Sequence, residues 1–318
     1  MMSAAVSATV TAADSSWGAF TASSTWSPDP SQGELTLVVL PDGSLPSRDG
    51  VLALAPGAAS IVAPGALAVP MAQRVSAVAL TAEAAAAAVP GAAWRPWREF
   101  ARGGALAPDV EAAVRAGALL AWHRAASHWG VDGSPTAPAD DGRRRVAGGG
   151  GASRPRTLYP RVDPVAIVLC VSADGERALL GRQAAWPPRM FSCIAGFVEL
   201  GESAECAALR ELQEETGVRA ARAALVASQA WPAGRAGGAE LMLACVAVAV
   251  DAAAEAVDVG HAGDAGGAGE LSEARWFSRE EVRAMVDGEH AGGLSAPPRL
   301  AIAHALMRRW ASGALAAP

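Results

Sequence analysis

The sequence contains no lysine, a single tyrosine and only four cysteines among its 318 residues. All 26 residues counted as lysine or arginine are arginines, and alanine and glycine are abundant. We interpret this bias as a property of the coding composition and not as a functional signal. Because the net charge is −6, a dedicated nucleic-acid groove and a surface for anionic membranes are both disfavoured.

The four cysteines lie far apart, so no two of them form a Cys-x-x-Cys pair. This spacing excludes a locally built zinc ribbon and a thioredoxin-type redox site. Cys170 and Cys245 fall within apolar runs, which predicts buried free thiols. A reducing, intracellular compartment fits this usage best, and the sequence does not distinguish cytosol, peroxisome, plastid and mitochondrion.

Hydrophobic spans that could form a transmembrane helix are also missing. Residues 50–73 carry no charge, but Pro56, Pro64 and Pro70 would break a helix there. We therefore expect no membrane partner. Residues 1–33 are rich in Ala, Ser and Thr but lack the arginines that transit peptides normally need. We expect a disordered tail there, with a targeting segment as the alternative.

A chain of this length usually folds as two domains. In residues 34–128, short apolar runs alternate with Pro and Gly turns, and helical spacing follows from Asp109. This pattern predicts a small sheet-containing domain that ends in a helix reaching about His128. Residues 129–158 are rich in arginine and glycine, and we expect them to form a flexible linker.

Residues 159–318 have the pattern of a mixed α/β domain. An apolar, β-branched run at residues 165–171 predicts a buried strand, and residues 178–180 predict its hairpin partner. We expect a further strand over residues 241–250 and a closing helix over residues 297–310 with proline at its start.

An acidic cluster lies in the middle of this domain. Glu211, Glu214 and Glu215 are spaced i, i+3 and i+4, so they project from one face of a helix. Ser203 is a suitable N-cap for this helix and Gly217 a suitable C-terminal stop. Hard divalent cations bind such carboxylate oxygens. By itself, however, Glu-x-x-Glu-Glu is more often a solvated helix face.

A wider pattern favours the metal site. The stretch fits G-x5-E-x7-R-E-U-x-E-E-x-G-U, where U is apolar, at every fixed position: Gly196, Glu202, Arg210, Glu211, Leu212, Glu214, Glu215, Gly217 and Val218. This pattern is the Nudix box, and the chain resembles Nudix hydrolases. The resemblance implies an α/β/α sandwich as the catalytic domain, preceded here by the smaller sheet-containing N-terminal domain.

Further strings resemble the NADH pyrophosphatase branch of that family. They are Ser228-Gln-Ala-Trp-Pro232 with Leu241-Met242, Tyr159-Pro-Arg-Val-Asp-Pro164, Glu270-Leu-Ser-Glu-Ala-Arg-Trp-Phe277 and Pro297-Pro-Arg-Leu-Ala-Ile-Ala303-His. The resemblance covers about residues 105–311. Two departures stand out. Ala233 replaces a phenylalanine, with an apparent insertion at residues 234–240, and Trp129 and Asp132 replace the first cysteine pair of that branch's zinc ribbon. We therefore expect no zinc.

The resemblance implies hydrolysis of the acid anhydride of NADH or NAD+, which gives nicotinamide mononucleotide and AMP with Mg2+ or Mn2+ as cofactor. The metal ligands it implies are Glu211, Glu214, Glu215, Glu270 and the carbonyl of Ala195. Clustered carboxylates perturb one another's pKa, so either Glu215 or Glu270 could act as the base for the attacking water. Arg210 is expected to have a structural role by pairing with Glu202 or Glu214.

The resemblance also implies a binding site for the dinucleotide. The residues concerned are Tyr159, Ala195, Gly196, Phe197, Trp231, Met242 and Ala303. Phe197 and Tyr159 resemble an aromatic pair that holds a base, with the tyrosine donated by a partner subunit, which implies a homodimer. Stacking of this kind contributes about 1–3 kcal/mol. Plain core packing is the alternative for Phe197, Trp231 and Met242.

Two other functions stay open at this point. One is a Nudix hydrolase for ADP-ribose or for NAD-capped RNA. The other is a catalytically silent nucleotide-binding module, which the intact carboxylates of Glu202, Glu211, Glu214 and Glu215 disfavour because a sensor would not need them all.

Overall fold

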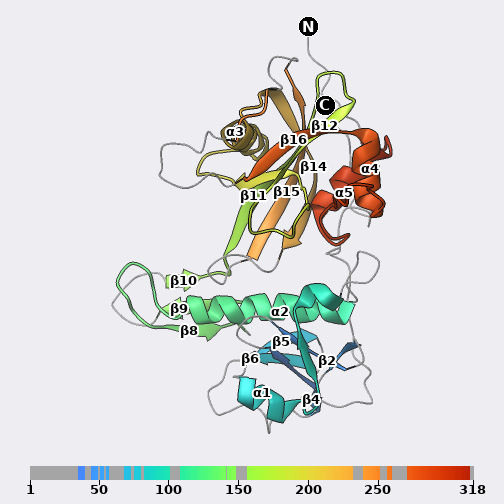
Figure 1. Cartoon of the computed structure of the whole chain (residues 1–318). Coiled ribbons are helices and arrows are strands. Elements are labelled where there is room, and N and C mark those ends of the chain that lie inside the picture. Colours follow the sequence, from blue (N-terminus) through green and yellow to red (C-terminus); the bar gives the residue numbers. More distant parts are fainter. Residues whose placement is uncertain are drawn as a thin grey trace. The chain divides into compact units, whose positions relative to one another are not determined.

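The computed structural model of the chain forms two compact units, which are described separately (Figure 1). One unit consists of residues 20–163 with 230–240, and the other contains residues 164–229 and 241–318. The residues that the structure describes are 35–39, 44–48, 51–53, 55–56, 68–72, 75–79, 82–100, 108–140, 142–147, 156–231, 239–250, 256–259 and 271–315. The tail expected at residues 1–33 lies outside them.

The first unit contains the predicted N-terminal sheet region, divided into two small sheets. The strand orders are β4(Ala55–Pro56)-β1(Leu35–Val39)-β6(Val75–Ala79)-β5(Ala68–Ala72) and β3(Val51–Leu52)-β2(Leu45–Arg48)-β7(Ala93–Arg95). Helix α1 (Ala82–Ala88) and a 3-10 helix (Trp97–Phe100) flank them, and α2 (Pro108–Ala125) packs against β5 and β6. Helix α2 therefore ends at Ala125 and does not reach His128.

Residues 129–158, which we expected to be a flexible linker, contain an ordered antiparallel sheet instead. Its order is β10(Arg156–Leu158)-β9(Arg144–Ala147)-β8(Thr136–Ala139). The arginine- and glycine-rich composition predicted flexibility, whereas Arg145 of this segment is buried. Its guanidinium donates to the Oγ1 and the carbonyl oxygen of Thr136, each at 2.7 Å, and to Nδ1 of His123 at 3.0 Å. Each nitrogen of this buried guanidinium thus has an acceptor, which stabilises a buried charge.

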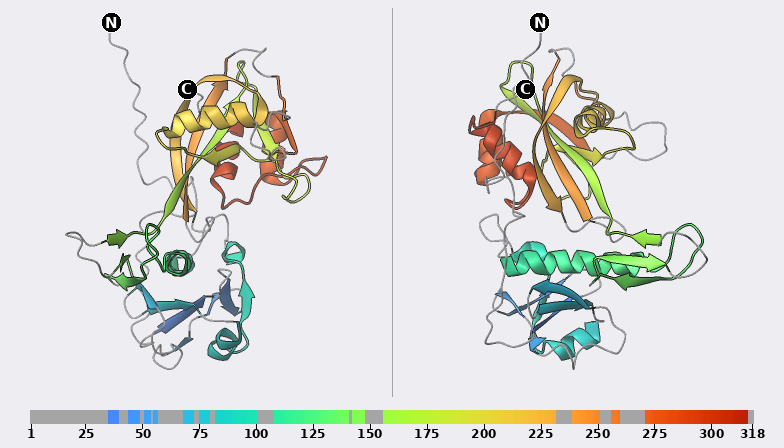
Figure 2. Two further views of the ribbon diagram at one scale, coloured as in Figure 1. Left: turned by 90° about the vertical axis from the view of Figure 1, so that its left-hand side faces the viewer. Right: turned by 180° about the vertical axis from the view of Figure 1, so that it is seen from behind.

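The second unit is the expected α/β/α sandwich. Its sheet has the order β14-β15-β11-β12-β16, with β13 paired to β11. The strands are β11(Val162–Val171), β12(Arg177–Arg182), β13(Ile194–Phe197), β14(Ala220–Trp231), β15(Ala239–Ala249) and β16(Glu273–Ser278). Helix α3 (Ala204–Thr216) covers one face, while α4 (Arg279–Asp287) and α5 (Ile302–Ala311) cover the other (Figure 2).

Strand β11 is buried on both faces, which explains its continuous apolar run. Ile167 and Leu169 belong to the core cluster beneath α4 and α5, whereas Ala166 and Val168 belong to the cluster beneath α3. The predicted hairpin with β12 is present, because Cys170 is paired with Leu179 and Val171 with Ala178. Cys170 and Cys245 are buried free thiols, as predicted.

The C-terminal helices differ from expectation. Helix α5 begins at Ile302 and not at Pro297, because the amide of Ala301 closes a turn onto the carbonyl of Pro298 at 2.8 Å before the helix starts. Helix α4 was not predicted, although Ser278 and Glu281 form a capping box at its start. In the part of the chain that the structure describes, no helix combines the length and apolar character needed to cross a membrane.

Candidate active site

Helix α3 forms where the sequence predicts it and ends at the predicted caps. Ser203 Oγ accepts a hydrogen bond from the amide of Cys206 at 3.2 Å. Gly217 adopts a φ of 69°, in the left-handed region that favours glycine, and its amide donates to the carbonyl of Gln213 at 2.8 Å. The buried face of α3 includes Ala208 and Leu212, so the opposite face is free to carry the acidic residues.

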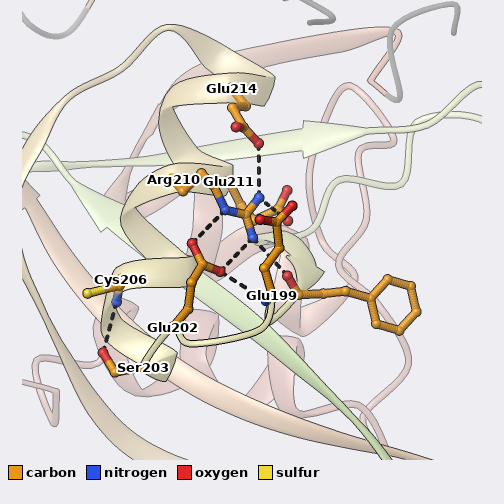
Figure 3. A network of polar contacts seen from close by, with 8 residues as sticks. Glu199, Glu202, Ser203, Cys206, Arg210, Glu211 and Glu214 are labelled. Atoms are coloured by element: carbon orange, nitrogen blue, oxygen red, sulfur yellow. Dashed lines mark hydrogen bonds and ion pairs between the residues drawn. The ribbon is translucent and has the colours of Figure 1, made fainter. Parts of the chain in front are cut away.

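Arg210 lies at the centre of the acidic residues of α3 and the preceding loop (Figure 3). Its Nε and Nη2 donate to the two oxygens of Glu202 at 2.8 and 2.9 Å, a bidentate contact. Its Nη1 donates to Glu211 at 2.8 Å and to Glu214 at 2.9 Å. Its Nη2 also donates to the carbonyl of Phe197 at 2.8 Å. We predicted contacts with Glu202 or Glu214; both are present, and those with Glu211 and Phe197 are additional.

The same contacts set the electrostatics of the loop. Hydrogen bonds from Arg210, and then one from the amide of Glu199, lower the pKa of Glu202 to about 2. The contact with Glu202 in turn raises the pKa of Arg210 above its already high value. Glu202 therefore stays ionised throughout the neutral range and holds the loop between β13 and α3 against the helix.

Glycine at position 196 is required by the position of Glu211. A Cβ atom built on Gly196 would lie 1.9 Å from Cδ of Glu211 and 2.0 and 2.2 Å from its oxygens, closer than any such contact in proteins. The carboxylate of Glu211 thus lies directly on the backbone of β13, in the space that a side chain would fill. Gly196 is paired with Ala166 and Ala195 with Ile167 of β11, so the sheet fixes this surface.

The three carboxylates of α3 occupy different environments. The side chain of Glu211 is 13% exposed, whereas that of Glu214 is 56% exposed. Both carboxylate oxygens of Glu215 are buried. Glu270, the fourth acidic residue that the resemblance implies, lies outside the described residues. A cation that bound here would therefore meet one solvated and two sheltered carboxylates.

The donor chemistry of this cluster fits a hard divalent cation, because Mg2+ prefers carboxylate and carbonyl oxygens. In the structure, Arg210 forms ion pairs with the acidic residues of this cluster. Over the described ranges of the chain, no three His, Cys, Asp or Glu side chains converge as a metal-binding group. Glu211 and Glu214 instead point to the guanidinium of Arg210 (Figure 3). Each of these contacts uses one carboxylate oxygen, Oε1 of Glu211 and Oε2 of Glu214.

The expected substrate-binding residues divide between the two units. Ala195, Met242 and Ala303 belong to or pack against the core cluster beneath α4 and α5, and Ala303 is itself buried. Phe197 follows on β13 and is 36% exposed.

Tyr159 and Trp231 belong to the other unit. Tyr159 is 67% exposed, and the ring of Trp231 packs edge-on against Trp97 with 5.1 Å between centroids. The structure therefore brings Glu202, Glu211, Glu214 and Gly196 together around Arg210. It places Ala195, Met242 and Ala303 in or against one core cluster.

Sequence reasoning missed Gln229 as a residue of this region. It is buried near the end of β14 and contacts the start of α5 at the backbone of Leu300 and Ile302. Gln229 itself stands in the string Ser228-Gln-Ala-Trp-Pro232, but the sequence of β14 carries no signal that its side-chain amide reaches a helix.

Comparison with known proteins gives a consistent result. The family model described as the NUDIX domain matches residues 161–295. The chain is 38% identical over 202 residues to NAD-capped RNA hydrolase NUDT12 of Macaca fascicularis, covering 62% of this chain and 40% of that protein. It is 38% identical over 203 residues to NAD-capped RNA hydrolase NudC of Mycobacterium bovis, covering 62% of this chain and 59% of that protein.

A plant protein is also similar. The chain is 40% identical over 167 residues to Nudix hydrolase 19, chloroplastic, of Arabidopsis thaliana, which covers 52% of this chain and 35% of that protein. The chain therefore spans less than two thirds of the length of the curated relatives that it matches.

Proposed function

Residues 161–295 of this chain are a Nudix domain, and on that premise we propose that the protein hydrolyses the diphosphate of NADH or NAD+ to nicotinamide mononucleotide and AMP. The observation that carries the proposal is the cluster formed by Glu202, Glu211 and Glu214 around Arg210, with Glu211 lying on the backbone of Gly196. Such a cluster combines hard oxygen ligands with a rigid support, which hydrolysis at phosphorus needs.

Glu211, Glu214, Glu215 and the carbonyl of Ala195 would hold the divalent cation, Mg2+ or Mn2+, with Glu270 as a further ligand. When bound, such a cation neutralises phosphate oxygens and lowers the pKa of water. Arg210 acts as a positioning residue, because its five donors fix the orientation of Glu202 and Glu211. The loop between β13 and α3 is thereby held in one conformation while the charge on the phosphate oxygens changes.

A proton must leave the attacking water during hydrolysis. Glu215 or Glu270 accepts it in our proposal, since a carboxylate beside the attacking water can serve as a general base. The buried oxygens of Glu215 support its candidacy. The proton passes to the carboxylate as the water oxygen attacks phosphorus, and the second mononucleotide leaves with the bridging oxygen.

In this proposal, recognition of the dinucleotide falls to Phe197, Met242 and Ala303 in the second unit, together with Tyr159 of a second copy of the chain. The exposure of Tyr159 supports its donation to a second copy of the chain, so we extend the proposal to a homodimer. Light scattering of the purified protein tests the dimer. A monomer at working concentration would remove Tyr159 from the site.

NAD-capped RNA is a second candidate substrate. The relatives from Macaca fascicularis and Mycobacterium bovis favour it, since both are named NAD-capped RNA hydrolases. The diphosphate that is cleaved would be the same, because the RNA chain extends from the adenosine half of the dinucleotide. The net charge of −6 disfavours tight RNA binding but not cleavage at an RNA 5′ end.

The test is product analysis by HPLC with NADH, NAD+, ADP-ribose and NAD-capped RNA, each with Mg2+ or Mn2+. We expect nicotinamide mononucleotide from the three NAD-type substrates and a severe loss in Glu214→Gln. Glu205→Gln is the matched control, because Glu205 lies on the same helix outside the cluster. Turnover of ADP-ribose alone would contradict the substrate assignment, and no turnover of any substrate would leave only a nucleotide-binding module.

A further inference from the structure

His123 is a buried histidine in the last turn of α2 that joins this helix to the sheet of strands β8, β9 and β10. Its Nε2 lies 2.7 Å from the carbonyl oxygen of Gly142, in the turn between β8 and β9. Its Nδ1 lies 3.0 Å from Nη1 of Arg145 on β9. Both ring nitrogens are therefore used, and both contacts lead from the helix to the same β-hairpin.

These two partners fix the protonation state of the ring. A guanidinium only donates hydrogen bonds, so Nδ1 of His123 must accept from Arg145. A carbonyl oxygen only accepts, so Nε2 must carry the proton and donate to Gly142. The geometry is therefore that of a neutral imidazole. A second proton could enter only at Nδ1, where it would replace the hydrogen bond from Arg145 with two cations about 3 Å apart.

The surroundings of the ring oppose that second proton. Burial is the largest cause that lowers the pKa of His123; the hydrogen bond to Gly142 raises it, and the charge of Arg145 lowers it further. Strands β5, β6 and β8 contain no titratable residue. Other charged residues of the neighbouring elements are Asp140 and Arg143 in the turn and Arg124 on α2, all exposed, Arg144 on β9, and Arg98 and Glu99 in the 3-10 helix. Glu99 is paired with Arg95 at 3.0 Å, and Asp141 of the turn lies outside the described residues.

Arg145 connects the ring of His123 to the whole sheet. It donates to Oγ1 and to the carbonyl oxygen of Thr136 on β8, and Thr136 Oγ1 in turn donates to the carbonyl oxygen of Ala126, just after α2, at 2.7 Å. On its other side β9 pairs with β10, where Arg145 stands opposite Leu158. The next residue of the chain is Tyr159. The contact with His123 is therefore one strand away from the backbone that carries this tyrosine.

We propose that the contact between His123 and Arg145 is a pH-sensitive latch, closed at neutral pH, that holds β9 and β10 against α2 and thereby fixes Tyr159. A proton from solvent that binds Nδ1 of His123 opens the latch, because the hydrogen bond from Arg145 is lost and the two cations repel each other. Thr136 keeps its own bond to Ala126, so the loosening is centred on β9 and β10. The use of Tyr159 at the dinucleotide site rests on the proposed function, whereas the latch itself does not.

Hydrogen exchange follows the latch without any substrate. In the open form His123 regains its ordinary pKa of about 6.5, whereas in the closed form the pKa is lower. The ratio of open to closed molecules should therefore rise about tenfold between pH 7.5 and 5.5. Protection factors of the β9 and β10 amides, corrected for the intrinsic exchange rate at each pH, should fall by the same factor. The amides of β6, in the same unit, should change by less than about twofold.

Two variants assign the response to one residue. His123→Gln carries an amide that does not titrate, so its β9 and β10 protection factors should not depend on pH. His128→Gln is the matched control, because His128 is exposed in the same segment, and it should keep the tenfold response of the parent chain. If His123→Gln does not fold, NMR titration of the histidines in the parent chain replaces it. The ring of His123 should then titrate below pH 6.5, together with the loss of protection at β9.

Tyr159 is the only tyrosine, so isotope labelling of tyrosine gives one ring signal that reports on its position. This NMR signal should shift with pH over the same interval in the parent chain and in His128→Gln, but not in His123→Gln. A signal that stays constant while β9 opens would overturn the role of the latch in fixing Tyr159.

Two further outcomes would overturn the latch itself. A tenfold response that persists in His123→Gln would show that another group senses the pH. An equal loss of protection at β6 would show that the whole unit unfolds. If the chain cleaves no dinucleotide, the proposed function fails, but hydrogen exchange and the tyrosine signal still decide whether the latch exists.

Discussion

Helices α3 and α5 of the same domain are held in place by different means. Helix α3 is capped by its immediate neighbours in sequence, Ser203 at its start and Gly217 at its end. Helix α5 is held by residues far away in the sequence. Gln229 contacts its first amide, and Arg279 donates to the carbonyl of Trp310 while its guanidinium carbon lies 4.4 Å from the centre of that ring.

This difference distinguishes the helix that carries the proposed catalytic residues from the helix whose position depends on remote contacts. Helix α3 carries the carboxylates and obtains its shape from local signals, so its functional face can be altered without loss of the helix. The placement of α5 arises only when β14 and α4 have assembled around it. Arg283 of α4 adds a hydrogen bond to the carbonyl of Ala311 at 2.8 Å, so that both ends of α5 have remote partners. Changes to α3 should therefore cost activity, and changes around α5 should cost stability.

The largest effect is expected for Glu211→Gln. The amide keeps the shape that fits over Gly196 but loses the charge, so kcat/KM should fall about 10²- to 10³-fold while the free energy of unfolding changes little. Steady-state kinetics and urea unfolding measure the two quantities, with Glu205→Gln as control. If Glu211→Gln loses stability and its activity loss follows from unfolding, the conclusion that α3 serves the reaction and not the stability is wrong.

Gly196→Ala should come next, at about 100-fold in activity. The new Cβ would occupy the space of the Glu211 carboxylate and displace it by a distance that matters for catalysis. Gly130→Ala is the matched control, since a Cβ there meets no atom within 4 Å. If both variants retained full activity, the position of Glu211 on β13 would be irrelevant to the reaction.

For stability, we expect a larger loss from a change at α5 than from a change at α3. Arg279→Met removes the hydrogen bond to Trp310, a second one to the carbonyl of Gly175 at 2.9 Å, and the stacking on the Trp310 ring. We expect a loss of about 2 kcal/mol in the free energy of unfolding. Ser203→Ala removes the cap of α3 and should cost about 1 kcal/mol. Urea denaturation of both variants compares them, and equal losses would abolish the distinction between the helices.

Acidification should produce the smallest of these effects, a change in the free energy of unfolding with pH. Because the pKa of Glu202 is about 2, its contribution to stability is present above its unfolded pKa and is lost only as the pH falls toward about 2. Burial lowers the pKa of His304, whose Nδ1 lies 2.9 Å from the carbonyl of Pro297. The unfolded chain then takes up the proton first, so stability is complete above about pH 6.5 and declines below it.

Urea unfolding of the parent chain and His304→Gln between pH 8 and 5 measures this contribution. The difference between the two curves should change below about pH 6.5, by at most about 1.4 kcal/mol per pH unit. Burial also lowers the pKa of His123 in the other unit, but both proteins share it, so the comparison isolates His304. Parallel curves would show that the pKa of His304 is the same in the folded and unfolded states.

Features specified by neighbouring residues were predicted well. The caps of α3, the spacing of its carboxylates and the β11–β12 hairpin follow from short stretches of sequence. The capping box of Ser278 and Glu281 was equally local and was overlooked, so α4 was missed. The linker prediction failed for another reason. Burial of Arg145 depends on acceptors supplied by His123 and Thr136, which composition cannot reveal.

The sequence by itself determined the acidic helix, because its caps and the carboxylates on its common face all lie within residues 203–217. Only the tertiary structure decided how Arg210 divides its donors among three glutamates and where α5 begins. The physical reason is separation along the chain. An amide at position 229 that satisfies one at position 302 leaves no local pattern, because the contact exists only after the sheet and the helix have packed.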